Sequence, residues 1–335
     1  MLPLKTRRVR HSTDWDEWRR LGGKRDQIRR EIREERRLDL QQQDTERLLN
    51  ILGVTGGKLP NDLKYIESHG VYIDERSQGT SKQLLGSPLF KNWLLSNRSW
   101  PLVVSGNSDT YATARCSPLS LLDVALTAQI NSMPQAQALY FFCGLHTRSD
   151  DEYAGPVGLL RTLIAQLLLW DWDYDLRVVW QSYPPDMLRS GNPDFLSVLL
   201  RALLAQKLES DTVFCIIDGP QHFEGSPLWH HQMESVMLNL YKLTFDPDIK
   251  VSFKLLVTTA GVSRIANSTI PGSYHIWITE DGGSGGGAEA EGVLNDREFE
   301  FEFSRRPYPE RREYYPPRSY DTFRSAENKY SEGFE

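Results

Sequence analysis

Four apolar segments, separated by segments with a helical period, occupy the middle of this chain. Between residues 101 and 280 the strand-like segments are WPLVVSG, ALYFFCGL, TVFCIID and KVSFKLLVTT, and they carry apolar residues in consecutive positions rather than in alternation. Such runs are typical of strands buried on both faces of a parallel sheet. The stretches between them, GPVGLLRTLIAQLLL and PDFLSVLLRALLAQKL among them, have the period and length of amphipathic helices. This alternation predicts an α/β fold in three layers, with helices on both faces of a mostly parallel sheet.

Composition divides the 335 residues into four regions. Residues 1–47 are expected to form a charged, largely helical arm, and residues 48–100 a helical lead-in to the core of residues 101–280. Residues 281–335 begin with a glycine-rich linker and continue as an Arg-, Tyr-, Pro- and Glu-rich tail that has too few aliphatic residues for a core. We therefore expect this tail to be disordered.

Charge and cysteine content narrow the class of protein. The net charge of -6 is small for this length, and acidic residues interleave with the arginines of the N-terminal arm. A solvated helix is therefore favoured over an arm that binds nucleic acid or an acidic membrane, which remains the alternative. No apolar run approaches the roughly 18 residues of a membrane span. Three widely spaced cysteines do not make a disulfide framework, so we expect buried thiols in a cytoplasmic protein.

The first strand leads into an incomplete phosphate-binding loop. Gly106 and Thr113 stand at the first and last positions of the pattern G-x-x-x-x-G-K-[ST], but Tyr111 and Ala112 replace its second glycine and its lysine. The glycine lets the backbone approach phosphate, and the lysine supplies positive charge. The candidate nucleotide-binding residues of this degenerate loop are Gly106, Thr110, Tyr111, Ala112 and Thr113.

Two further strands end in polar residues. Asp218 closes TVFCIID, and an aspartate at the end of a buried strand is a candidate ligand for magnesium if nucleotide binds. Thr258 and Thr259 close the next strand, where Thr259 is a candidate for contact with the γ-phosphate. Each signal is weak alone, but their order along the chain is that of a nucleotide-binding sheet.

Residues 60–280 resemble the nucleotide-binding module of fungal NACHT-type STAND proteins, the nephrocystin-type N-terminal P-loop NTPase domains. The likeness is carried by GTSKQLLGSPLFKNWLL, by FFCGLHTRSDDEYAGPVGLLRTLIAQLL, by VFCIIDGPQHFEG and by KLLVTTAG. It implies a P-loop NTPase-like fold, intracellular signalling, and protein partners that include other STAND proteins. The chain ends soon after the fourth strand, so we expect no winged-helix segment or repeat array.

The departures from the family pattern fall on its chemical positions. Besides Tyr111 and Ala112, Gln221 and His222 stand where the family has an Asp-Glu pair, and Ala260 stands where it has arginine. We therefore expect no catalytic residue and no bound cofactor. The favoured interpretation is a pseudo-NTPase module that acts as an interaction or regulatory protein.

Other interpretations stay open. The first is a weak ATP- or GTP-binding switch that uses magnesium with Gly106, Thr113 and Asp218, with Arg115 reaching a phosphate or His222 acting as a base. Metal binding by the adjacent His230 and His231 is disfavoured because neighbouring side chains point apart. The acidic residues of HTRSDDEY and WDWDYD are expected to lie in solvated loops.

Overall fold

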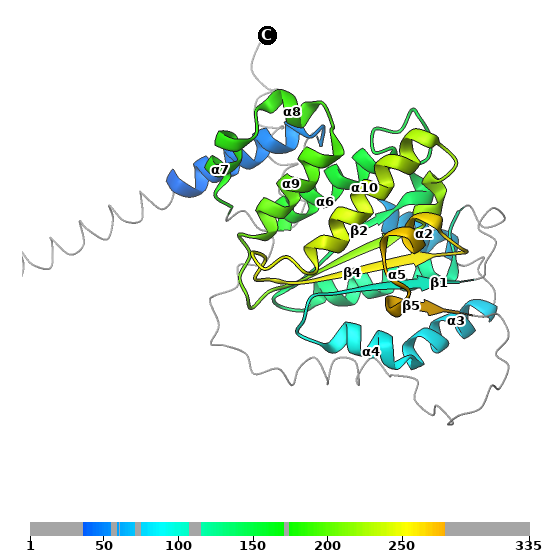
Figure 1. Ribbon diagram of the computed structural model, residues 1–335. Helices are drawn as coiled ribbons and strands as arrows, with labels where there is room; N and C mark the ends of the chain where they lie inside the picture. The colour runs from blue at the N-terminus through cyan, green and yellow to red at the C-terminus, as the bar shows by residue number, and fades with distance from the viewer. Residues whose placement is uncertain are drawn as a thin grey trace, which may run out of the picture.

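The computed structural model describes residues 36–54, 59, 61–70, 75–106, 115–170 and 174–278. Five strands form one sheet in the order β2-β3-β4-β1-β5, and every neighbouring pair is parallel (Figure 1). The strands are β1 (Trp100–Ser105), β2 (Ala136–Phe142), β3 (Thr212–Asp218), β4 (Ser252–Thr259) and β5 (His275–Trp277). The predicted α/β fold is confirmed, and β5 is a strand that the sequence did not indicate.

The helices follow the predicted alternation. They are α2 (Asp62–Gly70), α3 (Glu75–Gly86), α4 (Pro88–Leu95), α5 (Pro118–Ser132), α6 (Gly155–Trp170), α7 (Leu176–Ser182), α8 (Pro185–Arg189), α9 (Pro193–Leu204), α10 (Pro227–Leu243) and α11 (Arg264–Thr269). Three short 3-10 helices, η2 (Cys143–Leu145), η3 (Pro220–Phe223) and η4 (Gly272–Tyr274), join them. A further helix covers residues 36–51 and runs through residue 47, where the arm and the lead-in were expected to meet.

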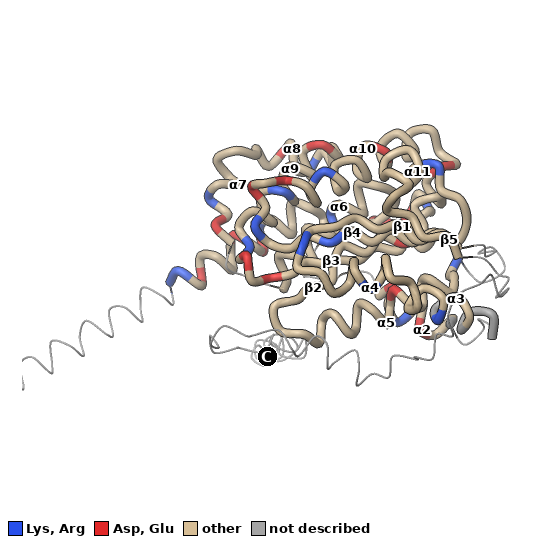
Figure 2. Tube along the Cα trace, turned by 60° about the horizontal axis from the view of Figure 1, so that its bottom comes forward, with Lys and Arg blue, Asp and Glu red and all other residues tan. Residues whose placement is uncertain are grey.

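Alternate residues of the strands face two separate apolar clusters, so the molecule has three layers. In β3, Cys215 and Ile217 belong to a cluster with α6, α9, α10 and the helix of residues 36–51. Phe214 and Ile216 belong to a second cluster, with α4 and α5. Figure 1 shows α6, α9 and α10 above the sheet and α3 and α4 below it. Most charged residues lie on the helices and loops around the sheet (Figure 2).

Local sequence explains the helices that cover the sheet. Ser87 precedes α4, Pro88 is in its first turn, and Phe90, Trp93 and Leu94 are buried. All the leucines of α6 except Leu169 are buried. None of the helices in the described ranges has both the length and the apolar character of a membrane span.

Candidate functional site

The direction of the connections changes at β1. The chain leaves β1 through α5, which packs in the cluster with α4, and crosses to β2 at the far edge of the sheet. From β2, β3 and β4 it returns through α6, α9, α10 and α11, which pack on the opposite face. In open α/β sheets, ligands bind beyond the carboxyl ends of the strands at such a switch. The carboxyl ends of β1, β3 and β4 are therefore the place to look for a site.

The phosphate-loop candidates fall only partly within the described residues. Thr110, Tyr111, Ala112 and Thr113 lie outside them, and Gly106 is described. The backbone N–H of Gly106 donates to the Thr259 carbonyl at 2.8 Å. A Cβ at Gly106 would make only ordinary contacts, since the nearest atoms are 3.5 Å away. The described surroundings thus do not require a glycine there.

The helix after the loop begins at Pro118 and brings a hydroxyl group to Asp218. Ser117 caps α5 and shares a capping box with Ser120. The Ser120 hydroxyl donates to Asp218 Oδ2 at 2.7 Å, and the Thr258 hydroxyl donates to Asp218 Oδ1 at 2.9 Å. Asp218 is only 5% exposed, so both carboxylate oxygens are bound inside the protein. Ser120 was not among the residues predicted for the site.

A second buried carboxyl group, that of Asp123, completes this network. Asp123 is fully buried, and its Oδ2 lies 2.5 Å from Thr258 Oγ1. Thr258 Oγ1 thus touches two carboxyl groups, yet a hydroxyl has one proton to donate. One of the two carboxyl groups must therefore be protonated and donate to Thr258.

The pKa values identify which carboxyl group holds the proton. Burial, reinforced by the charge of Asp218, raises the pKa of Asp123 well above its usual range. Burial also raises the pKa of Asp218, to about 6, while the hydrogen bonds from Ser120 and Thr258 act in the opposite direction. At neutral pH, Asp123 is thus a neutral acid that donates to Thr258, and Thr258 donates to ionised Asp218. The sequence does carry a signal for Asp123, because it falls on the stripe of Leu119, Leu126 and Ile130 along α5.

His222 and Arg115 lie beside each other at the same edge. His222 follows Gly219, whose φ of 70° is left-handed, and a Cβ on Gly219 would come within 2.9 Å of the His222 ring. Arg115 donates to the Gly144 carbonyl at 3.2 Å. Burial, together with the charge of Arg115, lowers the pKa of His222. The imidazole is therefore neutral and packed against backbone at the position of the family's acid.

The remaining predicted positions are structural in this geometry. The Thr259 hydroxyl donates to Ser105 Oγ at 3.0 Å and joins the ends of β4 and β1. His230 lies 3.5 Å from Glu234, one turn along α10. Among the described residues, no three His, Cys, Asp or Glu side chains are grouped to hold a metal ion. Asp175 caps α7, whereas Asp171 and Asp173 lie outside the described residues. Asp151 is not simply solvated, because its carboxylate binds His146.

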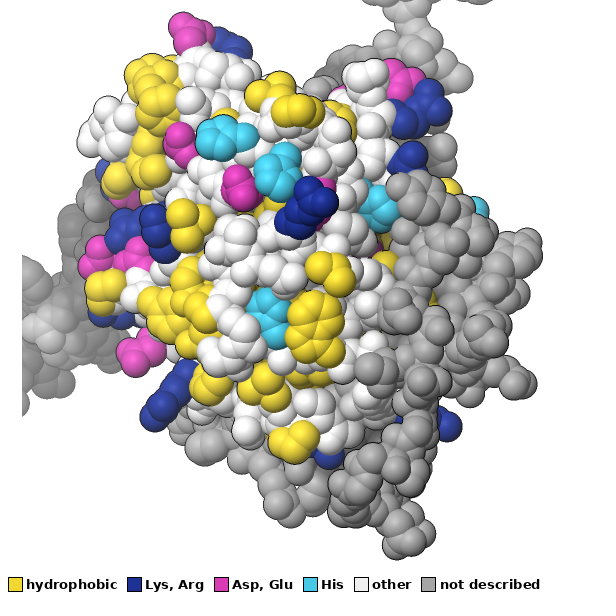
Figure 3. Space-filling view, turned by 45° about the vertical axis from the view of Figure 1, so that its right-hand side comes forward, with side chains coloured by type: hydrophobic (Ala, Val, Ile, Leu, Met, Phe, Trp, Pro, Cys, Tyr) yellow, Lys and Arg dark blue, Asp and Glu magenta, His cyan; other side chains and the backbone are white. Residues whose placement is uncertain are grey.

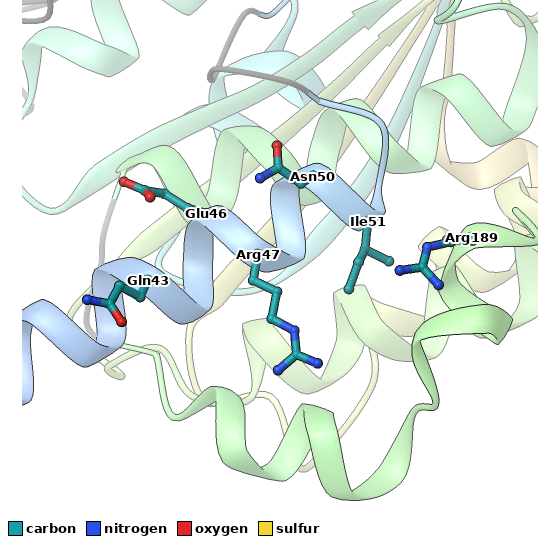
Figure 4. Close-up of a pocket in the computed structure, with 6 residues that line it drawn as sticks. All are labelled: Gln43, Glu46, Arg47, Asn50, Ile51 and Arg189. Carbon is teal, nitrogen blue, oxygen red and sulfur yellow. The ribbon is translucent and has the colours of Figure 1, made fainter.

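The surface adds two observations. Figure 3 brings forward the side toward which β1 and β5 point, and its coloured part shows several histidines among apolar and uncharged groups, some of them beside acidic and basic side chains. A groove of about 420 Å³ lies elsewhere, between the helix of residues 36–51 and α8 (Figure 4). Its lining consists of Gln43, Glu46, Arg47, Asn50, Ile51 and Arg189. The groove therefore shares no residue with the carboxyl edge of the sheet.

Comparison with known proteins identifies one family. The family model described as Nephrocystin 3, N-terminal matches residues 79–259, slightly more than half of the chain. The matched span begins within α3 and ends at the last residue of β4, so it contains Asp123, Asp218 and Thr258. No curated protein and no solved structure matches the chain.

Proposed function

The chain belongs to the nephrocystin 3 N-terminal family, and from this premise we propose a non-hydrolysing function for it. It is a degenerate NACHT-like module, related to fungal STAND receptors, that acts in the cytoplasm through protein partners. Other STAND proteins are the partners that its resemblance to this class favours. Nucleotide and magnesium are not required for this role.

The observation that carries the proposal is the engagement of Asp218. Magnesium prefers an ionised carboxylate oxygen at about 2.1 Å with near-octahedral geometry. Both Asp218 oxygens already accept hydrogen bonds, and Asp123 lies beyond Thr258 as a neutral acid. A magnesium ion would have to break bonds to Ser120 or Thr258 in a nearly closed space. The residues present therefore do not fit the metal as they are arranged.

The residues around Asp218 support the same conclusion. Ala112 cannot supply the positive charge that a phosphate-loop lysine brings to the β- and γ-phosphates. Gln221 has no carboxylate, and the His222 ring is packed against Gly144 and Gly219. Hydrolysis needs a group that orients the attacking water, and neither side chain carries the carboxylate of the family's acid pair.

One observation favours a second candidate function, a weak ATP- or GTP-binding switch with magnesium. Arg115 is exposed at this edge and places a guanidinium group beside His222. A guanidinium group can bind phosphate in place of the missing lysine. Binding would then also use Gly106, Thr113 and Asp218.

Titration calorimetry separates these two functions. The full chain is titrated with ATP, ADP and GTP in the presence of magnesium, and phosphate release is measured in parallel. We expect no binding up to millimolar nucleotide and no hydrolysis above the buffer rate. Micromolar binding that Asp218→Asn abolishes, with Asp186→Asn as the exposed control, would refute the proposal. Asp186 is suited to this control because its side chain is 92% exposed.

The interaction role needs its own measurement. Purified chain is mixed with the nucleotide-binding modules of STAND proteins from the same organism, and complexes are detected by light scattering after size exclusion. A complex that forms equally well with and without magnesium nucleotide is the expected result. A complex that forms only with nucleotide would favour the switch.

A further inference from the structure

His146 lies between two carboxylates in the segment that follows β2. Its Nδ1 is 2.6 Å from Asp151 Oδ2, and its Nε2 is 2.9 Å from Asp62 Oδ2. The ring packs at a tilt of 31° against Phe141, with centroids 4.7 Å apart, and the residue is only 5% exposed. An ionised carboxylate only accepts hydrogen bonds, so both ring nitrogens must donate. His146 is therefore an imidazolium in this arrangement.

The groups that pack against His146 favour its protonated form. Burial alone lowers the pKa of His146, but the hydrogen bonds and charges of Asp62 and Asp151 together raise it above its ordinary value. Tyr153, from the same loop, has its pKa raised to about 12 by burial and by neighbouring acids, so it stays neutral. Phe141 of β2 carries no charge. Among the described residues, the two aspartates are thus the charged groups that act on the ring.

The two carboxylates are held in different ways. Asp151 belongs to the same loop as His146 and accepts a hydrogen bond from the Tyr153 N–H at 2.9 Å. Asp62 lies in the first turn of α2 and meets His146 across 84 positions of the chain. A neutral imidazole has one N–H, so it can donate to only one of the two. Loss of the proton therefore leaves one carboxylate facing a lone pair, and the bond to Asp62 is the one that joins α2 to this loop.

Besides this contact, α2 packs against the domain through a small apolar cluster. Ile66 is 1% exposed and packs with Cys116, Val124 and Phe142. Cys116 directly follows Arg115, and Phe142 is the last residue of β2. The surface against which α2 packs is therefore next to the carboxyl edge of the sheet.

We propose that His146 is a proton-operated latch that fastens α2 to the domain through Asp62. When His146 loses its proton, α2 is released and Ile66 leaves its seat. The uncovered surface of Cys116, Val124 and Phe142 is apolar. This regulation goes beyond the proposed function and does not depend on it.

The direction of the pH effect follows from proton linkage. The folded-state pKa of His146 is raised, so the folded state binds more protons than the unfolded state above the ordinary pKa of about 6.5. The fastening of α2 is fully present below that pH. It is lost as the pH rises through the folded-state pKa of His146. Each unit by which the pKa is raised corresponds to about a tenfold change in the fastening equilibrium.

Amide hydrogen exchange on the full chain tests the latch. Protection of the α2 amides, corrected for the intrinsic rate at each pH, is followed from pH 6 to pH 9, with α6 as the internal reference. Between low and high pH, we expect the protection factor of α2 to fall by about tenfold for each unit by which the folded-state pKa of His146 is raised, while α6 stays protected. NMR titration of the His146 ring should give the same midpoint. Protection of α2 that is constant with pH, or that falls only together with α6, would overturn the proposal.

Substitutions distinguish a latch from a merely structural contact. Asp62→Asn keeps a hydrogen-bond acceptor but removes a charge, so the midpoint of the α2 transition should move to lower pH. His146→Gln should leave α2 poorly protected at every pH, and if that variant fails to fold, Asp62→Asn alone decides. His69→Gln is the matched control, because His69 lies on α2 itself and bonds to the Tyr65 carbonyl. A midpoint that Asp62→Asn does not move would refute the latch.

Discussion

Replacing Asp123 by asparagine should make the domain more stable at neutral and alkaline pH. Asp123 is fully buried, its Oδ1 has no hydrogen-bond partner among the described residues, and its Oδ2 contacts only Thr258 Oγ1 there. The amide of the introduced asparagine can donate to Thr258, as the protonated acid does, so the chain of bonds to Asp218 is kept. The amide does not titrate, so it never becomes a buried anion.

The size of the effect follows from the proton that Asp123 holds. Its pKa is raised by burial, so the folded state binds one more proton than the unfolded state at every pH between about 4 and the folded-state pKa. The free energy of unfolding then falls by about 1.4 kcal/mol per pH unit in that window. The variant should lose none of it, so the two stability curves diverge as the pH rises.

Urea unfolding followed by tryptophan fluorescence at pH 6, 7 and 8 measures this divergence. The difference between variant and wild type cancels the contribution of titrating groups outside this network, His146 included. Asp186→Asn, at an exposed aspartate, should run parallel to the wild type. Parallel curves for Asp123→Asn as well would mean that Asp123 is ionised in the folded state, and the account of the buried network would be wrong.

Three further substitutions test packing and hydrogen bonding. Gly158→Ala should lower the free energy of unfolding by about 3 kcal/mol, because a Cβ there would lie 1.9 Å from the Tyr153 carbonyl oxygen. Gly79→Ala on α3 is the control, because it has open space around it and should not destabilise the protein. Lys254→Met should cost about 2 kcal/mol, since its buried ammonium group donates to two carbonyls at the end of α4. Thr258→Val should cost about 3 kcal/mol, because both buried carboxyl groups lose their shared partner. Thermal unfolding at pH 7 measures all three, and a change below about 0.5 kcal/mol would contradict the stated contact in each case.

The elements of the fold could be predicted because their signals are local. Consecutive apolar residues marked β1 to β4, and the leucine period of α6 and the proline at the start of α9 marked those helices. The order of the strands could not be predicted, since it depends on which apolar surfaces meet. Nor did the sequence indicate β5, which has only three residues and begins with a histidine.

The candidate site was predictable only where one residue carried the signal. Asp218 stands out because a carboxylate ends an apolar strand, and its position at the carboxyl edge was expected. Its partners were not, because Ser120 is 98 positions away and its hydroxyl looks like any serine in a first helical turn. The contact between His146 and Asp62 joins residues 84 positions apart, and neither lies in a recognisable motif. Pairings of this kind become visible only when the chain is folded.

The buried network gives Asp218 a structural role that does not involve magnesium. Its carboxylate accepts hydrogen bonds from Ser120 and Thr258, so it joins the start of α5 to the ends of β3 and β4. Replacing it by an apolar residue would remove one buried hydrogen bond from each hydroxyl, and a typical hydrogen bond contributes about 0.5–1.5 kcal/mol to stability. An aspartate at the end of this strand is therefore favoured by packing alone. It follows that Asp218 is not by itself evidence for metal chemistry, and that the titration with nucleotide must decide the function of the site.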